Sequence, residues 1–197
     1  LDAHFVVDVL QGGAGTSTNM NANEVIANRA LEIIGQPKGA YDVIHPNDHV
    51  NASQSTNDTY PTAVKLATYF GIQDLLAALA ALRGAFQVKA EEFKNILKIG
   101  RTQLQDAVPM TLGQEFAAFA AMIADDEKRL RESAYLMCEV NMGGTAIGTG
   151  INAPVGYVDV VIPELARLSG VPVKAAANLI AATSDTGAFV DISGVLK

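Results

Sequence analysis

Two long stretches with helical periodicity constrain the fold of this chain more than any other feature. The first extends from Asp58 or Thr59 to about Lys98, and the second from Thr111 to about Val140. Two helices of this length in a chain of 197 residues predict a mainly α-helical bundle. The apolar residues that recur with helical spacing, and are therefore expected to face inward, are Leu66, Phe70, Leu75, Leu76, Leu79, Leu82, Phe86, Phe93, Leu112, Phe116, Phe119, Ile123, Leu130 and Met137.

The starts of both long helices carry capping signals. Asp58 or Thr59 can cap the first helix, because Pro61 then falls in its first turn. Thr111 and Gln114 have the spacing of a capping box at the start of the second. The start of each long helix is therefore predicted from a local signal, in which the residues lie only a few positions apart in the sequence.

The rest of the chain is expected to form one shorter helix and polar, glycine-rich loops, without alternation of strands and helices. The shorter helix is predicted over residues 19–34, with Gly35 as its stop. Residues 148–153 match the dinucleotide fingerprint GxGxxA, but a glycine-rich stretch precedes them where a strand is needed, and Pro154 follows. We interpret "GGTAIGTG", residues 143–150, as a tight loop at a helix end, whose bare backbone can approach a ligand.

Composition and charge argue against several classes of function. The net charge is −7 and no Lys/Arg cluster is present, which argues against nucleic-acid binding. The longest apolar run, residues 75–82, is too short to span a bilayer. Cys138 lies in an apolar helical pattern typical of a buried structural thiol. Three histidines without ligand spacing, and no paired cysteines, predict no metal site. We expect a cytoplasmic protein.

Three polar segments precede predicted helices. The first is "GGAGTSTNMNANE", in which Gly12, Gly13 and Gly15 lead into hydroxyl residues. Exposed backbone N–H groups at a helix start suit an anion, although an ordinary cap explains this segment equally well. The second is "QSTND" at residues 54–58, and the third is "GRTQLQDAVP" at residues 100–109. Together, neutral donors in three places suit a small dianion such as a dicarboxylate.

Four segments closely resemble, in order, the signature regions of the aspartase/fumarase superfamily. They are "GGAGTSTNMNANEV", "HPNDHVNASQSTNDTYPTA", "KIGRTQLQDAVPMTLGQEF" and "GGTAIGTGIN", so nearly the whole chain takes part. The class II fumarases of this superfamily typically have His where this chain has Gln103, and a second Ser where it has Thr56. The resemblance is therefore closest to the ammonia-lyase branch.

The resemblance implies a domain organisation. Residues 1–53 would be the C-terminal part of a small N-terminal domain, and residues 54–197 the first part of a long central helical bundle. The chain begins without Met and stops inside an apolar-periodic segment, so we expect an internal fragment. The mobile serine loop that carries the family's catalytic base has no counterpart here, and no catalytic residue is assigned.

The resemblance also implies a reaction without any cofactor, the reversible anti-elimination of ammonium from L-aspartate to give fumarate through an aci-carboxylate. Thr16, Ser55 and Thr56 would bind the carboxylate that gains charge. Asn57 would contact the amino group, which Gln103 would help to orient, and Thr102 would bind the other carboxylate end. The implied substrate-binding residues are thus Thr16, Ser55, Thr56, Asn57, Thr102 and Gln103.

Several further points follow from the resemblance. His45, Asn47 and Asp48 resemble the secondary anion-binding loop of fumarases, although a structural turn explains them equally well. Family members are homotetramers whose active sites are shared between subunits. Two alternatives stay open: a class II fumarase acting on malate and fumarate, and a non-catalytic helical oligomerisation module.

Overall fold

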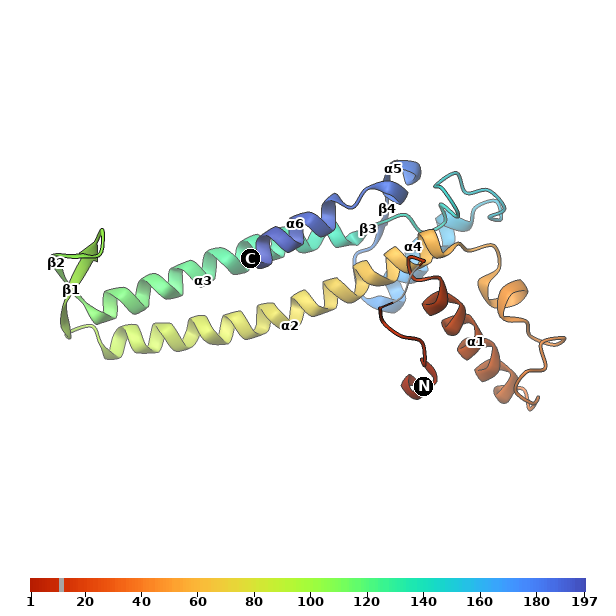
Figure 1. Cartoon of the computed structure of the whole chain (residues 1–197), viewed down its shortest axis with the longest axis horizontal. Coiled ribbons are helices and arrows are strands. Elements are labelled where there is room, and N and C mark those ends of the chain that lie inside the picture. The colour runs from red at the N-terminus through yellow and green to blue at the C-terminus, as the bar shows by residue number, and fades with distance from the viewer. Residues whose placement is uncertain (11–12) are drawn as a thin grey trace. The chain divides into compact units, whose positions relative to one another are not determined.

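A computed structural model describes residues 1–10 and 13–197 and is mainly helical, as predicted (Figure 1). The helices are α1 (Thr16–Ile33), α2 (Thr56–Glu92), α3 (Leu112–Ala134), α4 (Tyr157–Ser169), α5 (Leu179–Ser184) and α6 (Gly187–Leu196). Short helical turns are η1 (Asp2–His4), η2 (Pro46–Asn51) and η3 (Tyr135–Cys138). The strands are β1 (Leu97–Thr102), β2 (Gln105–Thr111), β3 (Glu139–Val140) and β4 (Lys174–Ala175).

The chain forms two compact units. The first comprises Leu1–Ala67 and Met137–Thr186, and the second comprises Thr68–Leu136 and Gly187–Lys197. The first turns of α2 therefore belong to the first unit and the remainder of α2 to the second. The predicted domain boundary after residue 53 stays a prediction.

In the second unit, α2 and α3 lie side by side (Figure 1). The ring of Phe116 packs 6.0 Å from that of Phe86 and 5.4 Å from that of Phe93. The carboxylate of Glu127, only 3% exposed, accepts from Arg83 Nε at 2.7 Å and Arg131 at 3.1 Å. The hydrogen bond from Arg83, then that from Arg131, holds the pKa of Glu127 below its ordinary value. Aromatic packing and a buried ion pair thus join the two helices.

Two predicted helix signals are confirmed. At the start of α3, Thr111 Oγ1 accepts from the backbone N–H of Gln114 at 3.1 Å, and Gln114 Oε1 accepts from the N–H of Thr111 at 2.9 Å. This is the predicted capping box. Gly35, predicted as the stop after the first helix, has a φ of +75°, a conformation that glycine adopts without strain. That helix begins at Thr16, three residues earlier than predicted.

The prediction that the first long helix continues to Lys98 is wrong. It ends at Glu92, and β1 and β2 form a two-stranded antiparallel hairpin in which Leu97 lies opposite Thr111. The turn residues Gln103 and Leu104 both have positive φ, at 50° and 61°, as two-residue hairpin turns require. Most of both strands is exposed, so no alternation of apolar and polar residues announces them. The second long helix likewise ends early, at Ala134, where η3 replaces its last predicted turn.

The predicted start of α2 is also wrong. The helix begins at Thr56, where the Ser55 hydroxyl oxygen accepts from the N–H of Asn57 at 3.1 Å. Pro61 lies inside the helix and has no N–H to donate to the carbonyl oxygen of Asn57. That oxygen accepts instead from the side-chain amide of Asn141 at 2.9 Å. A tertiary contact therefore replaces the hydrogen bond that proline removes.

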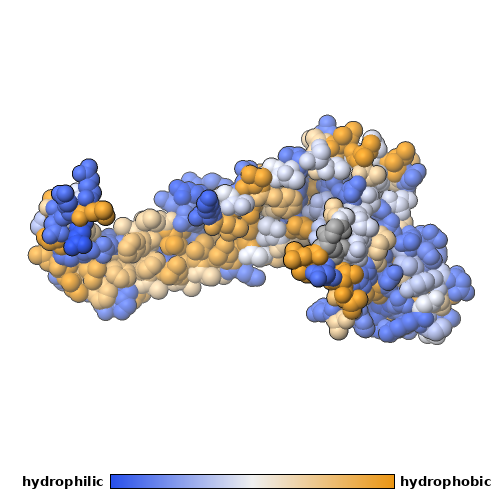
Figure 2. Space-filling model, in the orientation of Figure 1, coloured by the Kyte–Doolittle hydropathy of each residue, from blue (hydrophilic) through white to orange (hydrophobic). Residues whose placement is uncertain are grey.

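The predicted apolar face is only partly buried. Leu130 and Met137 are buried, as is Cys138, whose pKa is raised by burial. Phe70, Leu82 and Phe119 are 47%, 43% and 40% exposed, so the prediction that they face inward is wrong for each unit by itself. Figure 2 shows apolar side chains on the surface along the long helices. Two helices can cover only one side of each other, and the remaining apolar side chains stay exposed.

Among the described residues, α2 is the one helix long and apolar enough to cross a membrane, judged by length and composition alone. Charged residues that include Lys65, Asp74 and Arg83 are spaced along its length. No stretch of α2 therefore reaches the 18 or so uncharged residues that typify a membrane span.

Candidate functional site

Four of the six predicted substrate-binding residues lie in the first unit, three of them at the start of α2. Ser55 caps this helix, and Thr56 and Asn57 follow in its first turn. The side-chain amide of Asn19, in α1, donates to Thr56 Oγ1 at 3.0 Å. The amide of Asn57 donates to the carbonyl oxygen of Ala146 at 2.8 Å. The start of α2 is therefore joined both to α1 and to the glycine-rich loop at residues 141–150.

Asp58 is the buried centre of this region. Its side chain is inaccessible to solvent. One carboxylate oxygen accepts from the backbone N–H of Gly143 at 3.2 Å and of Thr145 at 2.8 Å. The other accepts from the N–H of Ser55 at 3.1 Å and from the Thr59 hydroxyl at 3.2 Å. Burial raises the pKa of this carboxyl, and the donated hydrogen bonds oppose that shift. The prediction that Asp58 caps α2 is wrong, since it lies within the helix and holds the loop.

Thr16, the fourth residue in this unit, is exposed at the start of α1, where its hydroxyl donates to the carbonyl oxygen of Gly13 at 2.9 Å. Gly15 precedes it with a φ of +89°. A side chain on Gly15 would come within 2.4 Å of the Tyr60 ring, so only glycine lets α1 approach α2 this closely. Gly12, part of the predicted anion seat, lies outside the described residues.

A series of hydrogen bonds made by side-chain amides connects α1 to the residues just before the start of α2. Asn23, in α1, donates to Asn51 Oδ1 at 3.0 Å, and the amide of Asn51 donates to the carbonyl oxygen of Gln54 at 2.7 Å. The Gln54 amide in turn donates to the hydroxyl of Tyr157 at 3.0 Å, and burial raises the pKa of that tyrosine. Of these residues, Gln54 was predicted from the sequence as part of the "QSTND" segment, whereas the roles of Asn23, Asn51 and Tyr157 were not predicted. The available signal was the repetition of Asn and Gln in these polar stretches.

Thr102 and Gln103 lie in the second unit. Thr102 ends β1 and pairs with Gln105, while Gln103 is the first residue of the hairpin turn. Both side chains are exposed. The structure thus brings Ser55, Thr56 and Asn57 together, and it places Thr102 and Gln103 next to each other in a separate unit. The substrate-binding role of the whole set stays a prediction.

The loop resembling a secondary anion site forms a capped turn. His45 Nδ1 accepts from the backbone N–H of Asn47 at 3.1 Å and of Asp48 at 3.2 Å. The N–H of His45 itself donates to His49 Nδ1 at 2.8 Å. The backbone N–H groups of Asn47 and Asp48 are therefore used inside the turn, an arrangement consistent with the alternative of a structural turn. An anion site here stays a prediction.

In the predicted tight loop at residues 143–150, the backbone of Gly148 lies close to other backbone atoms of the protein. A side chain on Gly148 would lie 2.4 Å from the backbone of Ile180, at the start of α5. Its φ of +92° also favours glycine. A cavity of about 320 Å³ borders this loop and is lined by Gly148 itself, together with Gly143 and Tyr157. The expected tight loop is present, and its bare backbone serves helix packing at this position.

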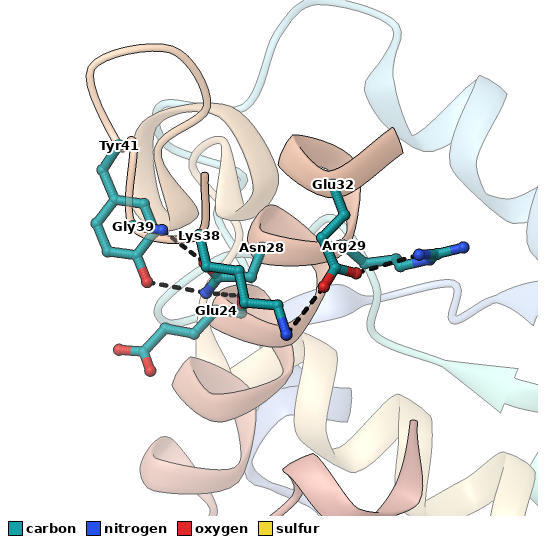
Figure 3. Close-up of polar contacts among 7 residues, drawn as sticks. All are labelled: Glu24, Asn28, Arg29, Glu32, Lys38, Gly39 and Tyr41. Atoms are coloured by element: carbon teal, nitrogen blue, oxygen red, sulfur yellow. Dashed lines mark hydrogen bonds and ion pairs between the residues drawn. The ribbon is translucent and has the colours of Figure 1, made fainter. Parts of the chain in front are cut away.

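A second polar cluster lies on α1 beside a cavity of about 280 Å³ (Figure 3). Glu32 pairs with Lys38 at 2.9 Å and with Arg29 at 3.1 Å, and Lys38 contributes most to holding the pKa of Glu32 below its ordinary value. The Asn28 amide donates to the Tyr41 hydroxyl at 3.0 Å. These groups satisfy one another, so we interpret the cluster as structural.

Comparisons with known proteins agree with one another. A family described as Lyase matches residues 1–197. Aspartate ammonia-lyase from Pseudomonas aeruginosa is 62% identical over 194 residues, which cover 98% of this chain and 41% of that protein. The chain therefore spans about 41% of the length of this curated relative.

Solved structures give the same picture. The crystal structure of fumarate lyase:delta crystallin from Brucella melitensis bound to cobalt matches with a TM-score of 0.98 and 61% identity, over 100% of this chain and 43% of that one. Recombinant class II fumarase from Schistosoma mansoni matches with a TM-score of 0.91 and 35% identity, over 98% of this chain and 44% of that one.

Proposed function

Because the chain belongs to the lyase family, within the aspartase/fumarase superfamily, we propose that it supplies substrate-binding segments of an aspartate ammonia-lyase. The reaction is the reversible deamination of L-aspartate to fumarate and ammonium. The observation that carries this proposal is the start of α2, where Ser55, Thr56 and Asn57 are held against α1 and the glycine-rich loop. No cofactor is part of the proposal.

The hydroxyls at this helix start suit a carboxylate ligand. Ser55 Oγ accepts from a backbone N–H, and Thr56 Oγ1 accepts from the Asn19 amide. Each hydroxyl keeps its own hydrogen to donate, and a hydroxyl that already accepts is a stronger donor. Neutral donors bind the substrate carboxylate without a fixed cation. Thr16 is proposed to complete this group.

The proposed chemistry is an anti-elimination. A base removes a proton from Cβ, the electron pair of that C–H bond moves onto the adjacent carboxylate, and the Cα–N bond then breaks to release ammonia. Donors aimed at the charged aci-carboxylate stabilise it, each by roughly 3 kcal/mol in a dry site. Asn57 accepts from the amino group, Gln103 orients it, and Thr102 binds the other carboxylate. The catalytic serine is proposed to come from outside these 197 residues.

Assembly is part of the same proposal. Thr102 and Gln103 belong to a different unit from Ser55, Thr56 and Asn57. We propose a cytoplasmic homotetramer in which segments from several subunits form each active site. The exposed apolar side chains on α2 and α3 support this arrangement, because they need partners to be buried.

The rival function is that of a class II fumarase, favoured by the close structural match to the Schistosoma mansoni protein. The complete enzyme, assayed by fumarate absorbance with L-aspartate or L-malate, distinguishes the two. We expect deamination of aspartate and almost no dehydration of malate, since Gln103 stands where fumarases have histidine. Efficient malate dehydration without aspartate turnover would identify a fumarase. No turnover of either would favour a non-catalytic helical oligomerisation module.

A further inference from the structure

We propose that Asp58 is a positioning residue that determines which end of the Asn57 side chain faces the ligand. Through the loop at residues 143–146, the Asp58 carboxylate holds the partner that orients the Asn57 amide, and so favours a ligand with an amino group. The inference rests on the proposed function and assigns a role to a residue that touches no substrate.

The first step is the anchoring of the loop. Asp58 is fully buried, and one of its carboxylate oxygens accepts from two backbone amides of the loop, those of Gly143 and Thr145. A charge buried this deeply persists only when hydrogen bonds satisfy it. Replacing the carboxylate with a neutral amide would present N–H hydrogens to some of these donors, and the loop would lose its anchor.

The second step is the backbone conformation that this anchor maintains. Thr145 has a φ of +56°, which is unfavourable for a β-branched residue. Its N–H donates to Asp58 at 2.8 Å, and its side chain is only 4% exposed. Residues hold such conformations where surrounding contacts impose them. The hydrogen bond to Asp58 is one such contact made by Thr145 itself.

The third step is the orientation of Asn57. Ala146 directly follows the strained residue, and its carbonyl oxygen accepts from Asn57 Nδ2 at 2.8 Å. An asparagine side chain has one donor end and one acceptor end. With Nδ2 committed to Ala146, the acceptor Oδ1 is the end of the amide that remains for a ligand, and Asn57 is exposed. That oxygen can bind an ammonium group, whereas the opposite orientation would present N–H hydrogens and repel it.

The test uses the complete enzyme in the amination direction, where ammonium and fumarate are separate substrates. We expect Asp58→Asn to raise the KM for ammonium about tenfold, the equivalent of one hydrogen bond to a charged group, and to change the KM for fumarate by less than about twofold. If Asp58 had a merely structural role, its replacement would weaken the binding of both substrates and raise both KM values together. Asp74→Asn, which removes an exposed carboxylate from the same helix, should leave both values unchanged.

Coupling to Asn57 provides a second measurement. If Asp58 acts through Asn57, then Asp58→Asn should add little to the ammonium KM of an Asn57→Ala enzyme. Should Asp58→Asn not fold, Thr59→Val keeps the carboxylate but removes a hydroxyl that contacts both Asp58 and the carbonyl oxygen of Ser55. We expect it to raise the ammonium KM by about threefold, and Thr59→Ser, which keeps that hydroxyl, should leave this KM unchanged.

The outcomes separate this inference from the proposed function. A wild-type enzyme that does not convert ammonium and fumarate overturns the proposed function. If the wild-type enzyme is active, any of three results for the folded variants overturns the positioning role. These are equal rises in both KM values, an unchanged ammonium KM, and effects that add to those of Asn57→Ala. A selective and non-additive rise in the ammonium KM supports it.

Discussion

Asn57 and Asp58 are neighbours in α2, yet their side chains face opposite environments. Successive residues of a helix point about 100° apart, so one side chain can enter the protein while the next stays at the surface. Asp58 is buried and uses both carboxylate oxygens within the protein. Asn57 is exposed and donates to Ala146 with one end of its amide. At the scale of single residues, the proposed roles of support and recognition thus fall on adjacent positions.

Thr102 offers a direct test of the predicted binding residues at this scale. We expect Thr102→Ala in the complete enzyme to lower kcat/KM for L-aspartate by about 10²-fold, because a positioned donor to the substrate carboxylate is lost. Steady-state kinetics by fumarate absorbance measures this. Thr102→Ser keeps the hydroxyl and should retain most of the activity. Wild-type kinetics in a folded Thr102→Ala enzyme would remove Thr102 from the binding residues.

At the scale of elements, the packing of α2 and α3 in the second unit depends on a close approach of the start of α3 to the end of α2. Gly113, in the first turn of α3, is buried, and its N–H donates to the carbonyl oxygen of Phe93 at 3.0 Å. A side chain there would lie 2.4 Å from the carbonyl oxygen of Ala90 and 2.6 Å from Cα of Lys94. Those neighbours are backbone atoms, so they cannot move aside as a flexible side chain would.

Two glycine substitutions test this contact against a matched control. Gly113→Ala should lower the melting temperature of the complete enzyme, since the added methyl group overlaps the backbone of α2. Gly84, inside α2, has open space at the same position, so Gly84→Ala should be neutral or stabilise by about 0.5–1 kcal/mol through helix propensity. Thermal melts of both variants decide it. A Gly113→Ala enzyme as stable as wild type would contradict the close approach.

At the scale of the whole molecule, the amount of exposed apolar surface is the main feature. In the second unit, Val88 is 66% exposed and Met122 is 62% exposed, in addition to the aromatic residues described above. A groove of about 620 Å³ in the same unit is lined largely by small side chains, among them Ala117, Ala120, Ala121 and Ala124. Small residues let another helix approach closely, and exposed apolar side chains favour its binding.

We therefore expect the 197-residue chain to self-associate or aggregate in solution, because association buries these apolar faces. Light scattering on the purified chain measures this directly. We also expect no deamination of aspartate above background, since the proposed catalytic serine comes from outside these residues, and a complementary C-terminal fragment should restore activity. A monodisperse monomer would contradict the assembly, and robust turnover by the chain alone would contradict the proposed source of the base.

The sequence by itself determined the features that depend on nearby residues. The long helices follow from apolar residues three and four positions apart, and the capping box of Thr111 and Gln114 spans a single turn. Gly35 as a helix stop and the burial of Cys138 follow from equally local patterns. Such features form from interactions within a few residues, so their signals are visible along the chain.

Only the tertiary structure decided the start of α2, the hairpin and the role of Asp58. Pro61 is accommodated inside α2 because Asn141, 84 positions from Asn57, supplies the missing donor. Asp58 is held by Thr145, 87 positions away, although its local surroundings resemble those of a helix cap. The strands of the hairpin are mostly exposed and therefore lack an apolar pattern. Contacts between residues so far apart depend on how the folded chain brings them together, and no spacing within the sequence records that.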